Sequence, residues 1–110
     1  MTVLVVQCEV AKEHVADLEA EAAEVAAALA EARPEGMRWA LGRLPDGVTF
    51  VGLLELAEGV ESAMPGIPAA RAFQQRLAER VVGDPPVPQP LDIVGAYGLF
   101  DGGDGDGAVA

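Results

Sequence analysis

The order of hydrophobic patterns along the chain is the feature that most restricts its fold. An alternating apolar run at Val3–Val10 precedes a segment, Lys12–Arg33, whose apolar residues recur every three or four positions. Alternation with a period of two predicts a strand, and spacings of three and four predict a helix with one apolar stripe. Two further apolar runs flank Leu44–Val48, where Pro, Asp and Gly favour a tight turn between two strands.

The second half of the chain adds one helix and one strand. A helix is expected to begin at Pro68, which suits a first helical turn, and to end at Gly83. A last strand is expected over Leu91–Phe100. The order therefore predicts an α+β fold, a ferredoxin-like βαββαβ arrangement with a four-stranded antiparallel sheet. Since 110 residues suffice for one core, residues 1–100 are expected to form one domain, and the acidic, Gly-rich residues 101–110 a disordered tail.

Two irregular connections flank the second helix. Gly59–Ile67 is long for a connection, with Met64 and Ile67 expected to be exposed, and it is interpreted as a possible lid. Gly83–Pro90 contains too many prolines for a helix and is expected to run as an extended spacer into the last strand.

Composition excludes several classes of partner. The net charge is −11, and seven scattered basic residues form no phosphate-binding patch, so we expect neither nucleic acid nor a membrane surface as a partner. Cys8 is the single cysteine and lies in an apolar strand, so an internal disulfide is excluded. No apolar run reaches membrane-spanning length and no basic region precedes the first one. A cytoplasmic location is expected.

The predicted strands are apolar on both faces. Val3 and Val5 alternate with Leu4 and Val6, and the third strand repeats this pattern. Two helices cover one face of a four-stranded sheet, so the other face would expose more apolar surface than a monomer usually does. A homodimer that packs sheet against sheet is therefore expected.

Four features of the chain occur together in one known superfamily. They are the βαββαβ order, the two-sided strands, Pro65–Pro68 leading into a helix with Ala72-Phe73, and the ending Asp92–Phe100. Through these features the chain resembles the dimeric α+β barrel superfamily over about residues 2–100. It is closest to the antibiotic-biosynthesis monooxygenase branch. That branch includes cofactor-independent monooxygenases, haem-degrading enzymes, small isomerases and members without known activity.

The resemblance implies a cofactor-independent monooxygenase that acts on a small aromatic or polyketide-like molecule in an apolar pocket. The alternatives are a non-catalytic small-ligand-binding or structural dimer module, or a small-molecule isomerase of the same fold. No cofactor is expected: the chain has no asparagine, which the haem-degrading members use, and no glycine-rich fingerprint follows its first strand. A metal site is not expected with one histidine and one cysteine.

Six residues are candidates for the site. Trp39, Phe50, Met64 and Phe73 are interpreted as substrate-binding residues of a pocket between sheet and helices, although core packing alone also accounts for such side chains. His14 is the candidate base, because an imidazole accepts a proton near neutral pH. Tyr97, on the predicted last strand, is assigned with it to catalysis.

Overall fold

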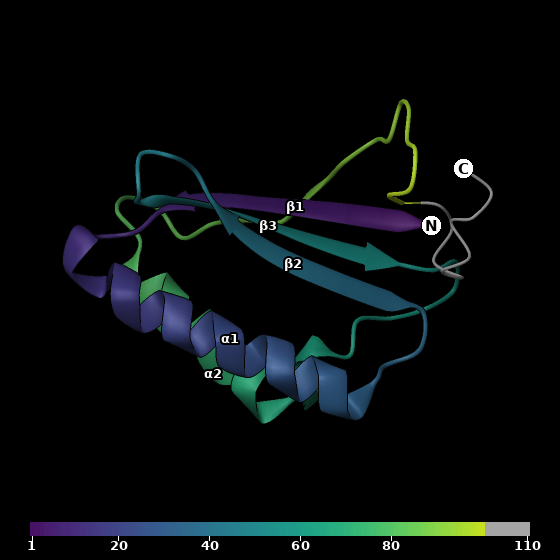
Figure 1. The fold of residues 1–110 in the computed structure, drawn as a ribbon, viewed down its shortest axis with the longest axis horizontal. Helices are drawn as coiled ribbons and strands as arrows, with labels where there is room; N and C mark the ends of the chain where they lie inside the picture. The colour runs from purple at the N-terminus through teal and green to yellow at the C-terminus, as the bar shows by residue number, and fades with distance from the viewer. Residues whose placement is uncertain (101–110) are drawn as a thin grey trace.

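A computed structural model describes residues 1–100 and has the predicted α+β architecture. One antiparallel sheet has the strand order β2-β3-β1-β4, and both helices lie on the same face of it (Figure 1). This is the ferredoxin-like arrangement expected from the sequence. The elements are β1 (Thr2–Glu9), α1 (Val15–Ala32), β2 (Met37–Arg43), β3 (Thr49–Leu56), α2 (Pro68–Arg80) and β4 (Gln89–Pro90), with short 3-10 turns η1 (Lys12–His14) and η2 (Met64–Gly66).

The turn between β2 and β3 forms where the sequence predicts it. The Asp46 carboxylate accepts hydrogen bonds from the backbone N–H of Val48 at 2.9 Å and of Thr49 at 2.8 Å, and from the Thr49 hydroxyl at 2.5 Å. These bonds stabilise the charged carboxylate and hold the pKa of Asp46 below its usual range, the bond from the Thr49 hydroxyl contributing most. Gly47 supplies the positive φ of +81° that the tight turn requires.

Both helices pack their apolar stripes toward the sheet. Leu18 and Val25 of α1 are fully buried, as are Ala70 and, nearly so, Phe73 of α2. The first predicted turn of the long helix is the 3-10 turn η1. The helix α1 ends at Ala32, and Arg33, which follows it, has the left-handed conformation.

One glutamate forms ion pairs between the two helices. Glu21 of α1 pairs with Arg80 at 2.5 Å and with Arg76 at 3.2 Å, both on α2. The Glu21 and Arg80 side chains are 15% and 17% exposed, so this pair is screened less than the exposed pair between Arg43 and Glu19.

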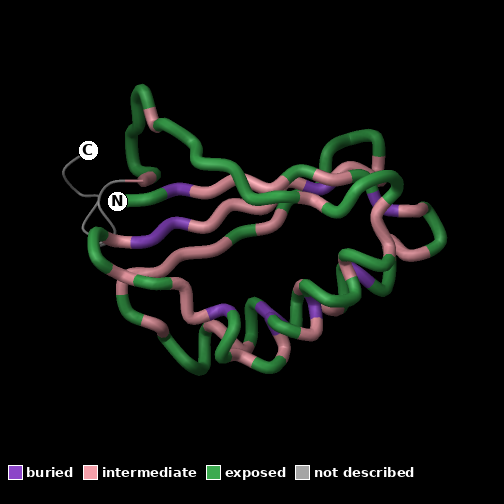
Figure 2. Tube along the Cα trace, turned by 180° about the vertical axis from the view of Figure 1, so that it is seen from behind, coloured by how far each residue is buried: buried purple, intermediate pink, exposed green. Residues whose placement is uncertain are grey.

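The predicted last strand over Leu91–Phe100 is wrong. The strand β4 contains only Gln89 and Pro90, which pair with Val5 and Leu4, and the N–H of Leu91 then donates to the carbonyl of Val3 at 2.8 Å. In this antiparallel register the segment runs toward the first residue of β1, Thr2, which lies one position before Val3. The rest of the segment therefore has no strand beside it to pair with. Residues 91–100 run outside the sheet and are largely exposed (Figure 2).

The second helix also ends earlier than predicted. It stops at Arg80 rather than Gly83, because the backbone of Val81 is extended and forms a β-bridge with Val10, the residue that follows β1. The acidic tail predicted for residues 101–110 lies outside the described residues.

The helices cover one face of the sheet and leave the other face open. The face toward the helices includes Phe50, which is 3% exposed. The opposite face includes Val5, Val51 and Leu53, all half-buried, with Leu53 lying between Val5 and Ala40 in the register. At one end of this face Glu55 is buried, and its Oε2 has no hydrogen-bond partner.

Candidate ligand-binding site

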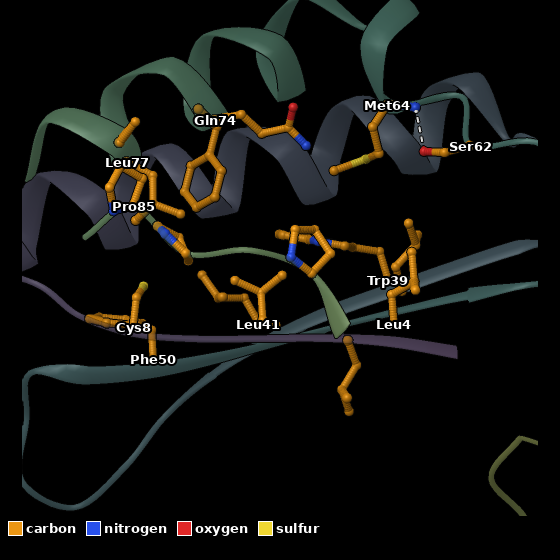
Figure 3. A pocket seen from close by; sticks show the side chains of 18 of the residues that line it. Leu4, Cys8, Trp39, Leu41, Phe50, Ser62, Met64, Gln74, Leu77 and Pro85 are labelled. Atoms are coloured by element: carbon orange, nitrogen blue, oxygen red, sulfur yellow. Dashed lines mark hydrogen bonds between the residues drawn. The ribbon is translucent and has the colours of Figure 1, made fainter. Parts of the chain in front are cut away.

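A cavity of about 380 Å³ lies between the sheet and α2 (Figure 3). The sheet supplies its floor from three strands, in which side chains of one parity point toward the helices. These floor residues are Leu4, Val6, Cys8, Trp39, Leu41, Phe50 and Leu54, and Gly52 and Leu53 of β3 also border the cavity. The opposite wall comes from Leu18 of α1 and from Phe73, Gln74, Leu77 and Ala78 of α2.

An aromatic pair closes one part of the cavity. The rings of Trp39 on β2 and Phe73 on α2 meet edge to face, with centroids 6.4 Å apart and an interplanar angle of 84°. This geometry is one that aromatic pairs favour, and it fixes the orientation of both rings. In Figure 3, Trp39, Met64 and Gln74 are directed toward the same space from β2, η2 and α2.

The cavity wall carries few polar groups. Ser62 accepts a hydrogen bond from the N–H of Met64 at 3.2 Å, and the side-chain amide of Gln74 adds one donor and one acceptor. Among the described residues that line the cavity, Cys8 is the one with a titratable side chain. Burial raises the pKa of the Cys8 thiol, so the group is a neutral thiol at neutral pH.

The structure brings the four predicted binding residues together. Trp39, Phe50, Met64 and Phe73 all line the cavity. Met64, expected to be exposed in the connecting segment, is 4% exposed and belongs to the core. The connection that was interpreted as a lid therefore supplies part of the wall.

The two predicted catalytic residues do not reach this cavity. His14 is half-buried at the end of η1, where its backbone N–H donates to the carbonyl of Ala11 at 2.9 Å. Its side chain lines neither this cavity nor the smaller one described below. Tyr97 is 81% exposed. It lies in the segment that follows β4, which stands on the side of the sheet opposite the helices (Figure 1). The structure thus places neither residue with the four binding residues.

Sequence reasoning missed one part of the site. Pro85, Pro86 and Pro88, which were interpreted only as a spacer, line the cavity. The signal was present in the sequence, since a segment that leads from α2 to an edge strand must pass the gap between the two layers. Gln74 was missed because an exposed helical glutamine carries no signal of its own.

A second, smaller cavity of about 300 Å³ lies between the end of α1 and β2. Trp39 borders both cavities. Within residues 1–100 there is no cluster of three or more side chains suited to hold a metal ion. No helix in the same part of the chain is long and apolar enough to cross a membrane.

Comparisons with known proteins identify the fold. No protein-family model matches the chain, and no curated protein matches it in sequence. Among solved structures, the chain is similar to an L-rhamnose mutarotase from Formosa agariphila, with 13% identity and a TM-score of 0.50. The match covers 86% of this chain and 96% of that one.

This likeness confirms the ferredoxin-like α+β fold that the pattern order predicts. It gives no support to the expected monooxygenase or to membership of the antibiotic-biosynthesis branch. At this level of identity, what the chain shares with the mutarotase is its fold.

Proposed function

We propose that the chain binds a small, mainly apolar molecule that contains an aromatic ring, in the cavity between the sheet and α2. The observation that carries this proposal is the wall of the cavity, which is apolar apart from Ser62, Gln74, the Cys8 thiol and the indole N–H of Trp39. A volume of about 380 Å³ lies within the range of small-molecule sites.

The chemistry of the wall restricts the ligand. No described charged side chain lines the cavity, so a charged group that entered it would lose its hydration without a partner. Each methylene that leaves water contributes about 0.8 kcal/mol to binding. Ser62 and Gln74 offer hydrogen bonds to one or two polar atoms, which favours a phenol or a ketone over a polyhydroxylated molecule.

A thermal shift measurement tests this proposal. We expect 1-naphthol to raise the unfolding temperature of the protein, and Trp39→Ala and Phe73→Ala to remove that rise, because each deletes one ring of the aromatic pair. Val94→Ala serves as the control, since Val94 is 99% exposed and does not line the cavity. A naphthol shift that survives both aromatic substitutions would contradict the proposed site.

A second candidate function is isomerisation of the bound molecule, which the likeness to a mutarotase favours over oxygenation. An isomerase that moves a proton needs a group that can donate or accept one. Within the described part of the wall that group is the Cys8 thiol, which the raised pKa keeps protonated.

An exchange experiment separates the two candidates. An isomerase that moves a proton of the bound molecule accelerates the exchange of the α-protons of 2-tetralone, an enolisable aromatic ketone, with deuterium from the solvent, measured by NMR, and loses the acceleration in Cys8→Ala. Absence of any acceleration in the wild type, together with a naphthol shift, would remove this isomerisation and leave binding.

The chain is further proposed to form a homodimer through the face of the sheet that the helices leave open. Val5, Val51 and Leu53 give this face an apolar centre, which is half-buried in the single chain. A second copy would complete their burial. A polar group from that copy could also satisfy Glu55 Oε2.

A further inference from the structure

The proline-rich segment between α2 and β4 has a role beyond connecting them. We infer that the proline strap, defined as Gly83–Pro88, is a rigid wall of the binding site that selects flat ring systems over flexible chains. Three of its residues, Pro85, Pro86 and Pro88, line the cavity. This inference rests on the proposed function, since it names the shape of the ligand that the same cavity takes.

Hydrogen bonds to β1 fix both ends of the strap. Before it, Val81 bridges Val10 and the N–H of Val82 donates to the carbonyl of Glu9 at 2.8 Å. After it, Gln89 and Pro90 pair with β1 as β4. The strap therefore passes alongside the β1 residues that lie between Val5 and Glu9, one of which is Cys8.

The strap is too long to follow the edge of β1 closely. The four residue steps from Val5 to Glu9 span about 13 Å of strand. The seven steps from Val82 to Gln89 reach about 22 Å when extended as polyproline. The surplus of about 9 Å has to bow away from the straight line between the two attachments.

The prolines prevent the surplus from being taken up by the sheet. Pro85, Pro86 and Pro88 have no N–H, so this stretch cannot donate a regular ladder of hydrogen bonds to β1. The bow instead turns its pyrrolidine rings into the space between β1 and α2, where they line the cavity beside Leu77 and Ala78. The sequence of the strap thus determines where the wall stands.

The rigidity of this wall determines which ligands fit. The ring of proline fixes φ, so the strap loses little conformational freedom when a ligand binds. Proline rings present apolar surfaces that pack well on aromatic rings, as proline-rich peptides do in aromatic grooves. A flat ring can rest on the strap without rearranging it, whereas a flexible chain loses its own rotational freedom on entering.

Two readouts test the strap, one of which needs no ligand. Cys8, the single cysteine, lines the cavity, so its rate of reaction with the neutral reagent 4,4′-dithiodipyridine reports access past the strap. The second readout is the ratio of the dissociation constants of 1-naphthol and 1-decanol, measured by calorimetry. The variant is Pro85→Ala with Pro86→Ala, and Pro86→Ala alone is the fallback if the pair does not fold.

Val87→Ala provides a matched control within the strap, because Val87 is 72% exposed and does not line the cavity. We expect the double variant to raise the Cys8 reaction rate about fivefold and to reduce the preference for naphthol over decanol about tenfold, since a loosened wall is less preorganised. Val87→Ala should leave both values unchanged.

The outcomes distinguish this inference from the proposed function. If the wild type binds 1-naphthol and either readout is unchanged in the double variant, the strap does not select the ligand and the inference is overturned. If the wild type binds neither probe, the proposed function fails, and an accelerated Cys8 reaction still supports the strap as the cover of the cavity. An unchanged reaction rate in that case overturns both.

Discussion

The two faces of the sheet have similar apolar side chains and different surroundings. On β3, Phe50 points to the helices and is 3% exposed, whereas its neighbour Val51 points to the open face and is half-buried. The same hydrophobic driving force favours the removal of both faces from water. The comparison shows that apolar alternation predicts burial of a residue without stating which partner covers it.

The covered face and the open face are therefore expected to respond differently to substitution. Changes on the covered face disturb the fold of one chain and the cavity. Changes on the open face disturb the proposed contact between two chains. The four predictions below test this difference, beginning with the largest effect.

The largest effect is expected from a charge on the open face. Val51→Asp would place a carboxylate in the apolar centre of the open face, at a residue that does not line the cavity, where burial of an unpaired charge against a second copy is costly. Light scattering should give about twice the 11.3 kDa chain mass for the wild type and a single chain or aggregate for the variant.

Leu44→Asp is the control, because Leu44 is 40% exposed in the turn between β2 and β3. It should leave the mass unchanged. A wild type that stays monomeric at micromolar concentration would rule out the dimer.

The next effect distinguishes the two faces at adjacent residues of one strand. Phe50→Ala should lower the free energy of unfolding by about 3 kcal/mol, because it removes a buried ring beside an existing cavity. In urea titrations this loss should be the same at every protein concentration. Val51→Ala should instead reduce the rise of the urea midpoint with protein concentration, because that rise comes from the contact between two chains. Equal losses at both positions that do not depend on protein concentration would mean that both faces stabilise the single chain only.

The fold and the position of four residues around one cavity were predictable, and the reasons are local. The periods of two and of three to four, with the turn at Pro45-Asp46-Gly47, were enough for the βαββαβ order. Trp39 and Phe73 were found because aromatic side chains on facing layers meet in a core.

The last strand was not predictable, since a strand needs a partner as well as a pattern. Ile93 and Tyr97 alternate as strand residues do, but they lie beyond the first residue of β1 and have no residue of that strand to pair with. Placing His14 and Tyr97 likewise depended on tertiary positions that no local period encodes. The proline strap was recognised as extended, but the direction of its bow follows from its two attachments to β1, which join residues far apart in the sequence.

A smaller effect is expected where the covering helices are joined. Glu21→Ala removes a carboxylate that pairs with two arginines of α2, Arg76 and Arg80. We expect a loss of about 1 kcal/mol in the free energy of unfolding, measured by urea titration, since the pair with Arg80 is mostly shielded from solvent. Glu24→Ala, on an exposed position of the same helix, should have no measurable effect. Similar losses in both variants would show helix propensity, rather than the ion pairs, to be responsible.

The smallest effect is expected at the turn, which belongs to neither face. The pKa of Asp46 is lowered in the folded chain, mainly by the hydrogen bond from the Thr49 hydroxyl, so the folded state favours the charged carboxylate. A depressed folded pKa contributes stability above the unfolded pKa, and this contribution is lost as the pH falls through the folded pKa. Asp46→Asn should therefore be less stable than the wild type at about pH 7, and this difference in stability should narrow toward about pH 3 as the wild-type carboxylate becomes protonated.

Urea midpoints of the wild type and the variant at both pH values measure this gap in stability, and Asp92→Asn, at an exposed residue, provides the baseline. A gap that stays constant between the two pH values would show that the turn depends on the shape of the Asp46 side chain and not on its charge.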